Sequence, residues 1–380
     1  MTRVITLRKL NLLIALAAVA GLAGLAVLMS GGRRTEGWVL RGKELRIYGA
    51  DYTLARLAQE VADPQILNYD PRTREATAKA SLIVYGSLQI GQPDDPKHLE
   101  TLYLDTIMCG DLRIEVPRGG ELRVHNAVLE TVKQILTTEQ CSQGYALLVD
   151  GTLRAANSKF LYMSGSRTET ARDRAQVDLD NVDFGLCDGC AFRTLGLDGE
   201  RVSIRGSRFK CAGQFGFFIR DSGGKPIVLR DCELYGQLAD LALSGRRPAA
   251  ELIDCLFRKD KIQFMGTSGQ AAVRWTVTAK AVERGTARPL AGIEIAATRL
   301  GPGPDETVTG RTGPDGTCPL VLTEYVATPD LPKPAMGLNT VTPHRIEARS
   351  PSGEPLAPPI LYEARGPRGT VTLELPPARP

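Results

Sequence analysis

The chain has 380 residues, and its 47 basic and 43 acidic side chains leave a formal net charge of +4. A charge this balanced lacks the basic footprint of nucleic-acid-binding proteins, so nucleic acid is excluded as a partner. Aromatic residues are only 6% of the chain, and an apolar content made mostly of aliphatic side chains favours thin layered cores over one large globule.

The N-terminal segment predicts export. Residues 11–29 form an uncharged apolar run, and Arg3, Arg8 and Lys9 precede it. The run is close to the roughly 20 residues that span a bilayer, and no small-x-small cleavage site clearly follows it. We expect residues 1–34 to be a membrane anchor or signal peptide, preferably one uncleaved transmembrane helix. The remaining chain is then periplasmic or extracellular, with the membrane as a partner.

A repeat organises the middle of the chain. Each unit has a turn residue, a small residue, a variable residue and then Phe or Leu, at residues 126–129, 157–160, 181–184, 206–209, 231–234 and 254–257. From Phe160 onward the large residues are spaced 24, 25, 25 and 23 positions apart. A short alternating apolar and polar segment precedes each unit, which is typical of a strand with one buried face. This pattern predicts a parallel β-solenoid, whose coils stack about 4.8 Å apart.

Stacking places equivalent residues in columns. An interior column is expected at Phe160, Phe184, Phe209, Leu234 and Phe257, and a small-residue column at Ser158, Val182, Ser207, Cys232 and Cys255. A turn column at Asn126, Asn157 and Asn181 is expected to form amide hydrogen bonds from coil to coil.

Fainter coils precede the clear repeat. Residues 81–90 and 99–107 alternate, residues 39–47 are a candidate first rung, and residues 51–65 have the spacing of one short helix that caps the open end. The solenoid is therefore expected over residues 35–270, with about nine coils and a length of roughly 40 Å.

The columns resemble those of a right-handed parallel β-helix of the pectate-lyase-like superfamily, over about residues 38–270. This resemblance is specific for the fold and carries no functional motif. Because many members of the superfamily cleave uronic-acid polymers along one face, it raises the possibility of a polysaccharide lyase or hydrolase.

The coil period stops after residue 269, and short strands joined by Gly, Pro and Asp turns follow at residues 274–282, 289–295, 308–316, 320–322, 344–348 and 370–375. They indicate an antiparallel β-sandwich over residues 271–380. Its order, with a tight turn at Asp315-Gly316, resembles the carboxypeptidase-regulatory-like domain, a seven-stranded transthyretin-like module. The resemblance implies a spacer, a stabilising element or a carbohydrate-facing module without an active site. The whole chain is thus expected to be all-β after its N-terminal helix.

Catalysis on the solenoid would need a calcium-binding acidic cluster with a basic residue, or paired carboxylates. The candidates are Asp178, Asp180, Asp183 and Lys210, beside a basic strip of Arg205, Arg230, Arg258, Lys259 and Lys261. The competing interpretation is that these residues are the solvated outer faces of strands. No cofactor is expected, and calcium only if the protein is a lyase.

Cysteine and histidine provide few further candidates. Cys187 and Cys190 form a Cys-x-x-Cys without a redox or zinc context, so they are interpreted as a structural disulfide with Cys211 or as inert buried thiols. Cys109 and Cys141 are a second possible pair. The three histidines, His98, His125 and His344, fall on separate elements, which disfavours histidine catalysis and histidine metal sites.

These features favour a non-catalytic, membrane-anchored envelope protein whose β-helix binds polysaccharide or a protein partner, or acts as a rigid scaffold. The alternative is a polysaccharide lyase or glycoside hydrolase that acts on an acidic polysaccharide at the β-helix face.

Overall fold

The computed structural model describes residues 37–95, 97, 99–106, 111–132, 144–164, 170–187, 189–300, 306–330, 342–350 and 352–377. No helix within these ranges is long and apolar enough to cross a membrane. The predicted anchor at residues 1–34 lies outside the described residues and stays a prediction.

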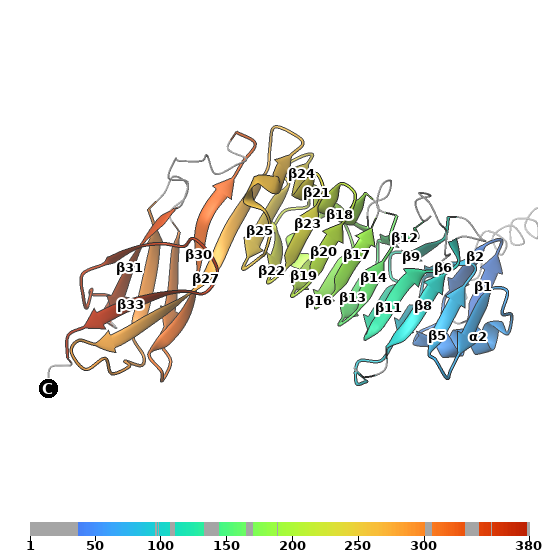
Figure 1. Cartoon of the computed structure of the whole chain (residues 1–380), viewed down its shortest axis with the longest axis horizontal. Coiled ribbons are helices and arrows are strands. Elements are labelled where there is room, and N and C mark those ends of the chain that lie inside the picture. The colour runs from blue at the N-terminus through green and yellow to red at the C-terminus, as the bar shows by residue number, and fades with distance from the viewer. Residues whose placement is uncertain are drawn as a thin grey trace, which may run out of the picture.

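The middle of the chain is a parallel β-helix. Three sheets, here A, B and C, run along it, and the coils up to β23 contribute one strand to each sheet, so that neighbours in a sheet come from successive coils. Figure 1 shows the coils as an elongated stack, with the C-terminal strands at one end. Alternating side chains explain the arrangement, because every second residue of strands such as β13 and β16 is buried and its neighbours face outward.

Sheet A consists of β1 (Trp38–Arg41), β2 (Glu44–Ile47), β6 (Ser81–Val84), β9 (Arg113–Val116), β12 (Ala146–Val149), β15 (Ala171–Arg172), β18 (Cys190–Leu197), β21 (Phe215–Ser222), β24 (Ala239–Ser244) and β26 (Ile262–Phe264). Sheet C consists of β4 (Leu67–Asp70), β5 (Glu75–Ala78), β8 (Glu100–Leu104), β11 (Ala127–Thr131), β14 (Lys159–Leu161), β17 (Asp183–Cys187), β20 (Arg208–Cys211) and β23 (Glu233–Gly236).

Sheet B consists of β3 (Tyr52–Thr53), β7 (Ser87–Ile90), β10 (Glu121–His125), β13 (Thr152–Ala156), β16 (Gln176–Asp180), β19 (Val202–Arg205), β22 (Ile227–Arg230), β25 (Ala249–Ile253), β27 (Gln270–Glu283), β30 (Thr317–Ala327) and β33 (Gly369–Leu375). Its strands up to β27 are parallel, as are those of sheet A from β2 onward. The predicted parallel solenoid is therefore confirmed.

The interior aromatic column forms as predicted over four coils. Phe160, Phe184, Phe209 and Leu234 are in register, and the ring centroids of the three phenylalanines are 4.9 and 5.2 Å apart in stacked geometry. Phe257 does not continue the column. It is only partly buried, because sheet C ends at β23 and the next coil contributes a single bridge, between Glu233 and Leu256.

A second aromatic stack went unpredicted. Phe192 on β18 and Phe217 on β21 stack with ring centroids 5.4 Å apart, and both meet Phe209 edge-on. The small-residue column lies buried beside these rings, at Ser158, Val182, Ser207, Cys232 and Cys255, as expected. Close packing of this kind leaves the interior of the coils filled by side chains.

The N-terminal end of the β-helix is capped. Helix α2 (Leu54–Val61) buries Leu54 and Leu57 against the core, and the side chain of Thr53 caps its first turn by accepting from Arg56 N. The predicted rung at residues 39–47 needs correction, since β1 is antiparallel to β2 and only β2 is a parallel rung. The hairpin therefore makes β1 the edge strand of sheet A at this end.

The C-terminal part contains two packed sheets. Strands β27, β30 and β33 extend sheet B, and a second sheet has the order β29 (Thr307–Arg311), β28 (Glu294–Arg299), β31 (Pro343–Arg349), β32 (Ile360–Glu363). Apolar side chains such as Val277, Ile295 and Leu320 lie between them in a common core. The sheets are not wholly antiparallel as expected, because β27 and β33 pair in parallel. The proposed membership of the carboxypeptidase-regulatory-like family stays a prediction.

One strand joins the two parts. Residues 270–274 of β27 form the last parallel rung of sheet B against β25, and the same strand continues to Glu283 inside the C-terminal sheets. Polar contacts bridge the same boundary. Lys259, on the short 3-10 helix η2 (Lys259–Lys261), and Trp275 Nε1 both donate to the buried carboxylate of Glu324, the latter at 2.7 Å. A continuous strand and a partly buried ion pair together hold the junction rigid.

Candidate functional site

The turn between sheets B and C carries a column of left-handed residues. Asn126, Asn157, Asn181, Asp231 and Asp254 have φ between 50° and 55°, a conformation that Asn, Asp and Gly adopt more readily than other residues. Each backbone N–H in the column donates to the carbonyl at the end of the next sheet B strand, as from Asn157 to Asp180 at 3.0 Å. The column is therefore a regular ledge along one corner of the rod.

Part of this ledge is an amide ladder. Asn181 Nδ2 donates to Asn157 Oδ1 at 2.8 Å, which confirms the predicted coil-to-coil bond between these two residues. Asn126 does not extend the ladder as expected. Its amide instead donates to the carbonyls of Gln92 and Pro93, at 2.6 and 3.2 Å, because this loop returns over the turn.

The ladder is interrupted at Gly206. This residue occupies the next position of the column, with φ +58°, but brings no side chain to continue the hydrogen bonds. A depression of about 150 Å³ lies here, lined by Asn157, Ser158, Lys159, Asn181, Val182, Asp183, Gly206 and Arg208. This depression was not predicted from the sequence, although Gly206 is a visible signal as a glycine in a column of Asn and Asp residues.

Charged side chains border the depression. Lys159, Asp183 and Arg208 are in register on β14, β17 and β20, so their charges alternate along the outer face of sheet C. Glu233 continues the series and lies 3.6 Å from Arg208 Nε. Within the described chain, neither Lys159 nor Asp183 belongs to an ion pair. The border therefore offers two cations and one carboxylate to a ligand.

The predicted catalytic candidates do not form one site. Asp178 and Asp180 lie on β16 of sheet B, whereas Asp183 and Lys210 lie on strands of sheet C, across the turn. Lys210 Nζ contacts Glu233 at 2.9 Å and none of the three aspartates. The expectation of one carboxylate face is wrong because the turn at Asn181 and Val182 redirects the chain between Asp180 and Asp183.

The predicted meeting of acidic and basic strips is realised as a surface ion pair. Arg205 Nη2 lies 2.7 Å from Asp180 Oδ2, and both side chains are largely exposed. This hydrogen bond raises the pKa of Arg205, so the guanidinium keeps its proton and is unsuited to act as the base of a lyase. The pair joins consecutive coils on the outer face of sheet B.

The cysteines of the Cys-x-x-Cys segment are buried free thiols. Cys187 lies in register with Cys211 on the next coil, whereas Cys190 belongs to sheet A and lies in register with Phe215. The disulfide proposed among these three residues is not formed. Burial raises the pKa of Cys187 to about 12 and raises that of Cys190 further, which makes both thiols inert. Cys109 and Cys141 lie outside the described residues.

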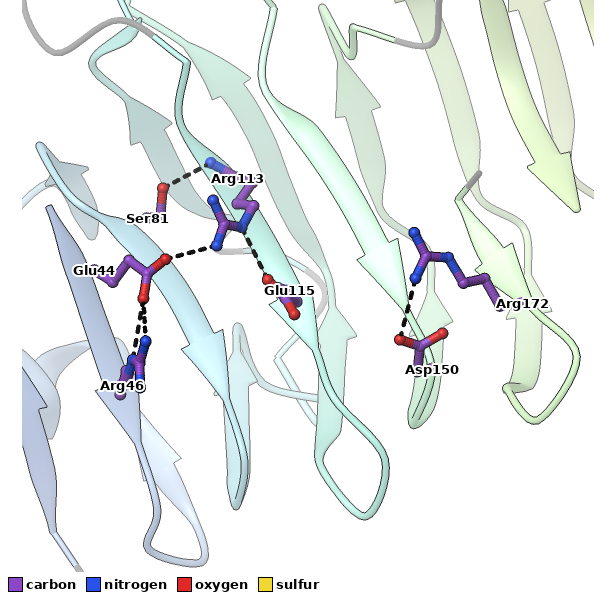
Figure 2. A network of polar contacts seen from close by, with 7 residues as sticks. All are labelled: Glu44, Arg46, Ser81, Arg113, Glu115, Asp150 and Arg172. Atoms are coloured by element: carbon purple, nitrogen blue, oxygen red, sulfur yellow. Dashed lines mark hydrogen bonds and ion pairs between the residues drawn. The ribbon is translucent and has the colours of Figure 1, made fainter. Parts of the chain in front are cut away.

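A chain of ion pairs covers the N-terminal end of sheet A (Figure 2). Glu44 accepts from Arg46 at 2.7 Å and from Arg113 at 2.6 Å, and Arg113 also donates to Glu115 at 2.8 Å. These bonds lower the pKa of Glu44, most strongly through Arg46. Sequence reasoning missed this network because Glu44 and Arg113 are 69 positions apart. Every charge in it is paired, which indicates that the network holds coils together.

Metal and histidine sites are not apparent in the described residues. They contain no group of three or more His, Cys, Asp or Glu arranged to hold a metal ion. His125 is on β10 of the β-helix and His344 is buried in β31 of the C-terminal part, while His98 lies outside the described residues. Burial lowers the pKa of His125 and of His344, so both are neutral at pH 7.

Comparisons with known proteins give little further information. No family model matches the chain, and no curated protein sequence matches it. The solved structures that match include the periplasmic alginate epimerase AlgG, with a TM-score of 0.40 and 11% identity over 63% of this chain and 65% of that one. A 9R-lipoxygenase from Cyanothece PCC8801 matches with a TM-score of 0.17 and 15% identity over 28% of this chain and 17% of that one. The chain thus spans less than two thirds of either protein.

Proposed function

We propose that the chain is a non-catalytic, membrane-anchored envelope protein whose β-helix binds polysaccharide along its outer surface. The observation that carries this proposal is the separation of the four candidate catalytic residues. Asp178 and Asp180 are on one sheet and Asp183 and Lys210 on another, whereas a carboxylate mechanism needs its groups to converge on one bond.

The shape of the candidate site supports binding over catalysis. The depression at Gly206 is open to solvent, and the Asn157–Asn181 amide pair is part of its lining. Catalytic sites exclude water and shift the pKa of their acids and bases, which requires burial. Binding of a hydroxyl-rich polymer requires only exposed donors and acceptors, and the amides of Asn157 and Asn181 beside the depression supply them.

The rigid junction supports a role in presenting this surface. Because β27 belongs to both the β-helix and the C-terminal sheets, the two parts are not connected by a flexible linker. Arg274 adds a second bridge, since it lies 3.6 Å from Glu251 of the last coil and 3.1 Å from Glu306 of the C-terminal part. Such a rod keeps its ligand at a fixed distance from its base.

The membrane and export part of the proposal rests on the N-terminal sequence. The apolar run at residues 11–29 and its basic flank would tether the chain, with the rod in the periplasm or outside the cell. Fractionation of cells that express the full-length protein tests this part. Recovery in the membrane fraction after a high-salt wash supports it, and recovery in the soluble cytoplasmic fraction contradicts it.

The binding proposal is tested with the full-length protein against a panel of acidic and neutral polysaccharides. Affinity electrophoresis measures binding, while reducing-end and unsaturated-product assays measure cleavage. We expect retardation by at least one polysaccharide without product formation. Product that disappears in an Asp183→Asn variant would establish the lyase or hydrolase alternative instead. Absence of both binding and product would leave only an architectural role.

A further inference from the structure

Gly206 breaks an otherwise continuous series of hydrogen-bonding side chains. The backbone pattern that defines the column runs unbroken through it, since Gly206 N donates to Arg230 O just as Asn181 N donates to Arg205 O. The gap is therefore local to the side chain. Asn181 donates from Nδ2 to Asn157. On the next coil, Gly206 has no side-chain amide that could donate to Asn181 Oδ1.

Sterics do not require glycine at this position. A Cβ built on Gly206 would meet its nearest neighbours, the backbone N and Cα of Asn181, at 3.7 and 3.8 Å, which is ordinary contact. Its φ of +58° is close to the values that Asn adopts at three equivalent positions of the same column, Asn126, Asn157 and Asn181. The space around Gly206 therefore admits an asparagine that would close the gap, although glycine adopts this left-handed φ at the least cost.

We propose that the gap at Gly206 is a subsite for one acidic sugar unit of a polysaccharide, an inference that rests on the proposed polysaccharide-binding function. Its volume of about 150 Å³ equals that of about five water molecules, the scale of a single sugar ring. The border supplies the matching chemistry. Lys159 and Arg208 are placed to receive a carboxylate through charge-assisted hydrogen bonds.

The hydroxyl groups of the same sugar unit would meet hydrogen-bond acceptors on other residues that line the depression. Asp183 brings a carboxylate, and Asn181 brings an amide oxygen. A sugar hydroxyl donates to such oxygens and can accept from an amide N–H, so a ring carrying both hydroxyl and carboxylate groups satisfies the whole border. A neutral sugar leaves Lys159 without an anion, whereas a carboxylate pairs with Lys159 and competes with Glu233 for Arg208, so the site is expected to prefer uronic acids.

The test fills the gap without disturbing the coil. The Gly206→Asn variant of the full-length protein is compared with Asp231→Asn, which places the same residue at the next position of the column, outside the depression. The probes are oligogalacturonate and a neutral cello-oligosaccharide of equal length, and calorimetry measures their affinity. Thermal unfolding of each variant checks that the fold is retained.

We expect wild type to bind oligogalacturonate more tightly than the neutral oligosaccharide. Gly206→Asn should weaken the affinity for oligogalacturonate by about tenfold or more, while its melting temperature stays the same or rises. Asp231→Asn should keep both the wild-type affinity and the wild-type melting temperature. An Arg208→Gln variant provides a second measurement if Gly206→Asn unfolds, and it should remove the preference for the acidic probe. Unchanged oligogalacturonate binding in the Gly206→Asn and Arg208→Gln variants would refute the proposed subsite but not the proposed polysaccharide-binding function. A wild-type protein that binds neither these probes nor any polysaccharide of the panel would refute the proposed function with it.

Discussion

The aromatic column of the β-helix yields a quantitative prediction. Phe184 is fully buried, and its ring contacts Phe160 at 4.9 Å, Phe209 at 5.2 Å and Phe192 at 5.2 Å between centroids. Truncation of a buried Phe to Ala costs about 3–5 kcal/mol of unfolding free energy. Because three ring contacts are lost together, each worth roughly 0.5–1.5 kcal/mol beyond area burial, we expect Phe184→Ala to fall in the upper half of that range.

Two comparison variants make this magnitude specific. Phe184→Leu loses the same ring contacts but should cost less than Phe184→Ala, because Leu leaves a smaller cavity and Leu234 already occupies the equivalent position two coils further on. Phe257→Ala should cost clearly less than Phe184→Ala, since Phe257 is only partly buried and lies off the column.

Urea unfolding followed by far-ultraviolet circular dichroism measures these differences. Amide hydrogen exchange then locates them, because neighbouring coils stabilise one another and exchange should accelerate first in β14, β17 and β20. A Phe184→Ala protein no less stable than Phe257→Ala would refute the reasoning, since it would mean that the stacked rings do not support the coils.

Two further predictions concern charge. Arg258→Ala should cost about 3 kcal/mol in urea unfolding, because Arg258 donates to both oxygens of the fully buried Asp240, at 2.6 and 3.2 Å, and its loss leaves a buried carboxylate without its cation. Arg205→Ala, in an exposed pair, should cost far less, and equal costs would contradict the buried-pair argument. Burial lowers the folded-state pKa of His344, so its contribution to stability is full above about pH 6.5 and decreases as the pH falls below that value. Melting temperatures between pH 7.5 and pH 5 should fall less steeply in a His344→Gln variant, and an identical pH dependence would show that His344 is not responsible.

The sequence predicted the solenoid because its stacking rule is local and repeated. A period of 23 to 25 residues places Phe160, Phe184, Phe209 and Leu234 in one column whatever the rest of the chain does. The prediction extended one coil too far at Phe257. The repeat in the sequence persists there, but sheet C has already ended.

The candidate site was predicted less well, because its geometry depends on turns and on residues far apart in the chain. Alternation along one strand relates Asp178 to Asp180, but the turn at Asn181 assigns Asp183 to another sheet. Pairs such as Glu44 with Arg113 have no signature in the sequence at all.

By itself, then, the sequence determined the parallel β-helix, its interior and small-residue columns and its N-terminal capping helix, since burial of alternate side chains repeats with a fixed period. Only the tertiary structure decided how the columns end, that β27 joins both parts of the molecule, and which charges meet. The physical reason is that strand pairing and ion pairing between distant residues depend on the path of the connecting loops, and a local pattern does not specify that path.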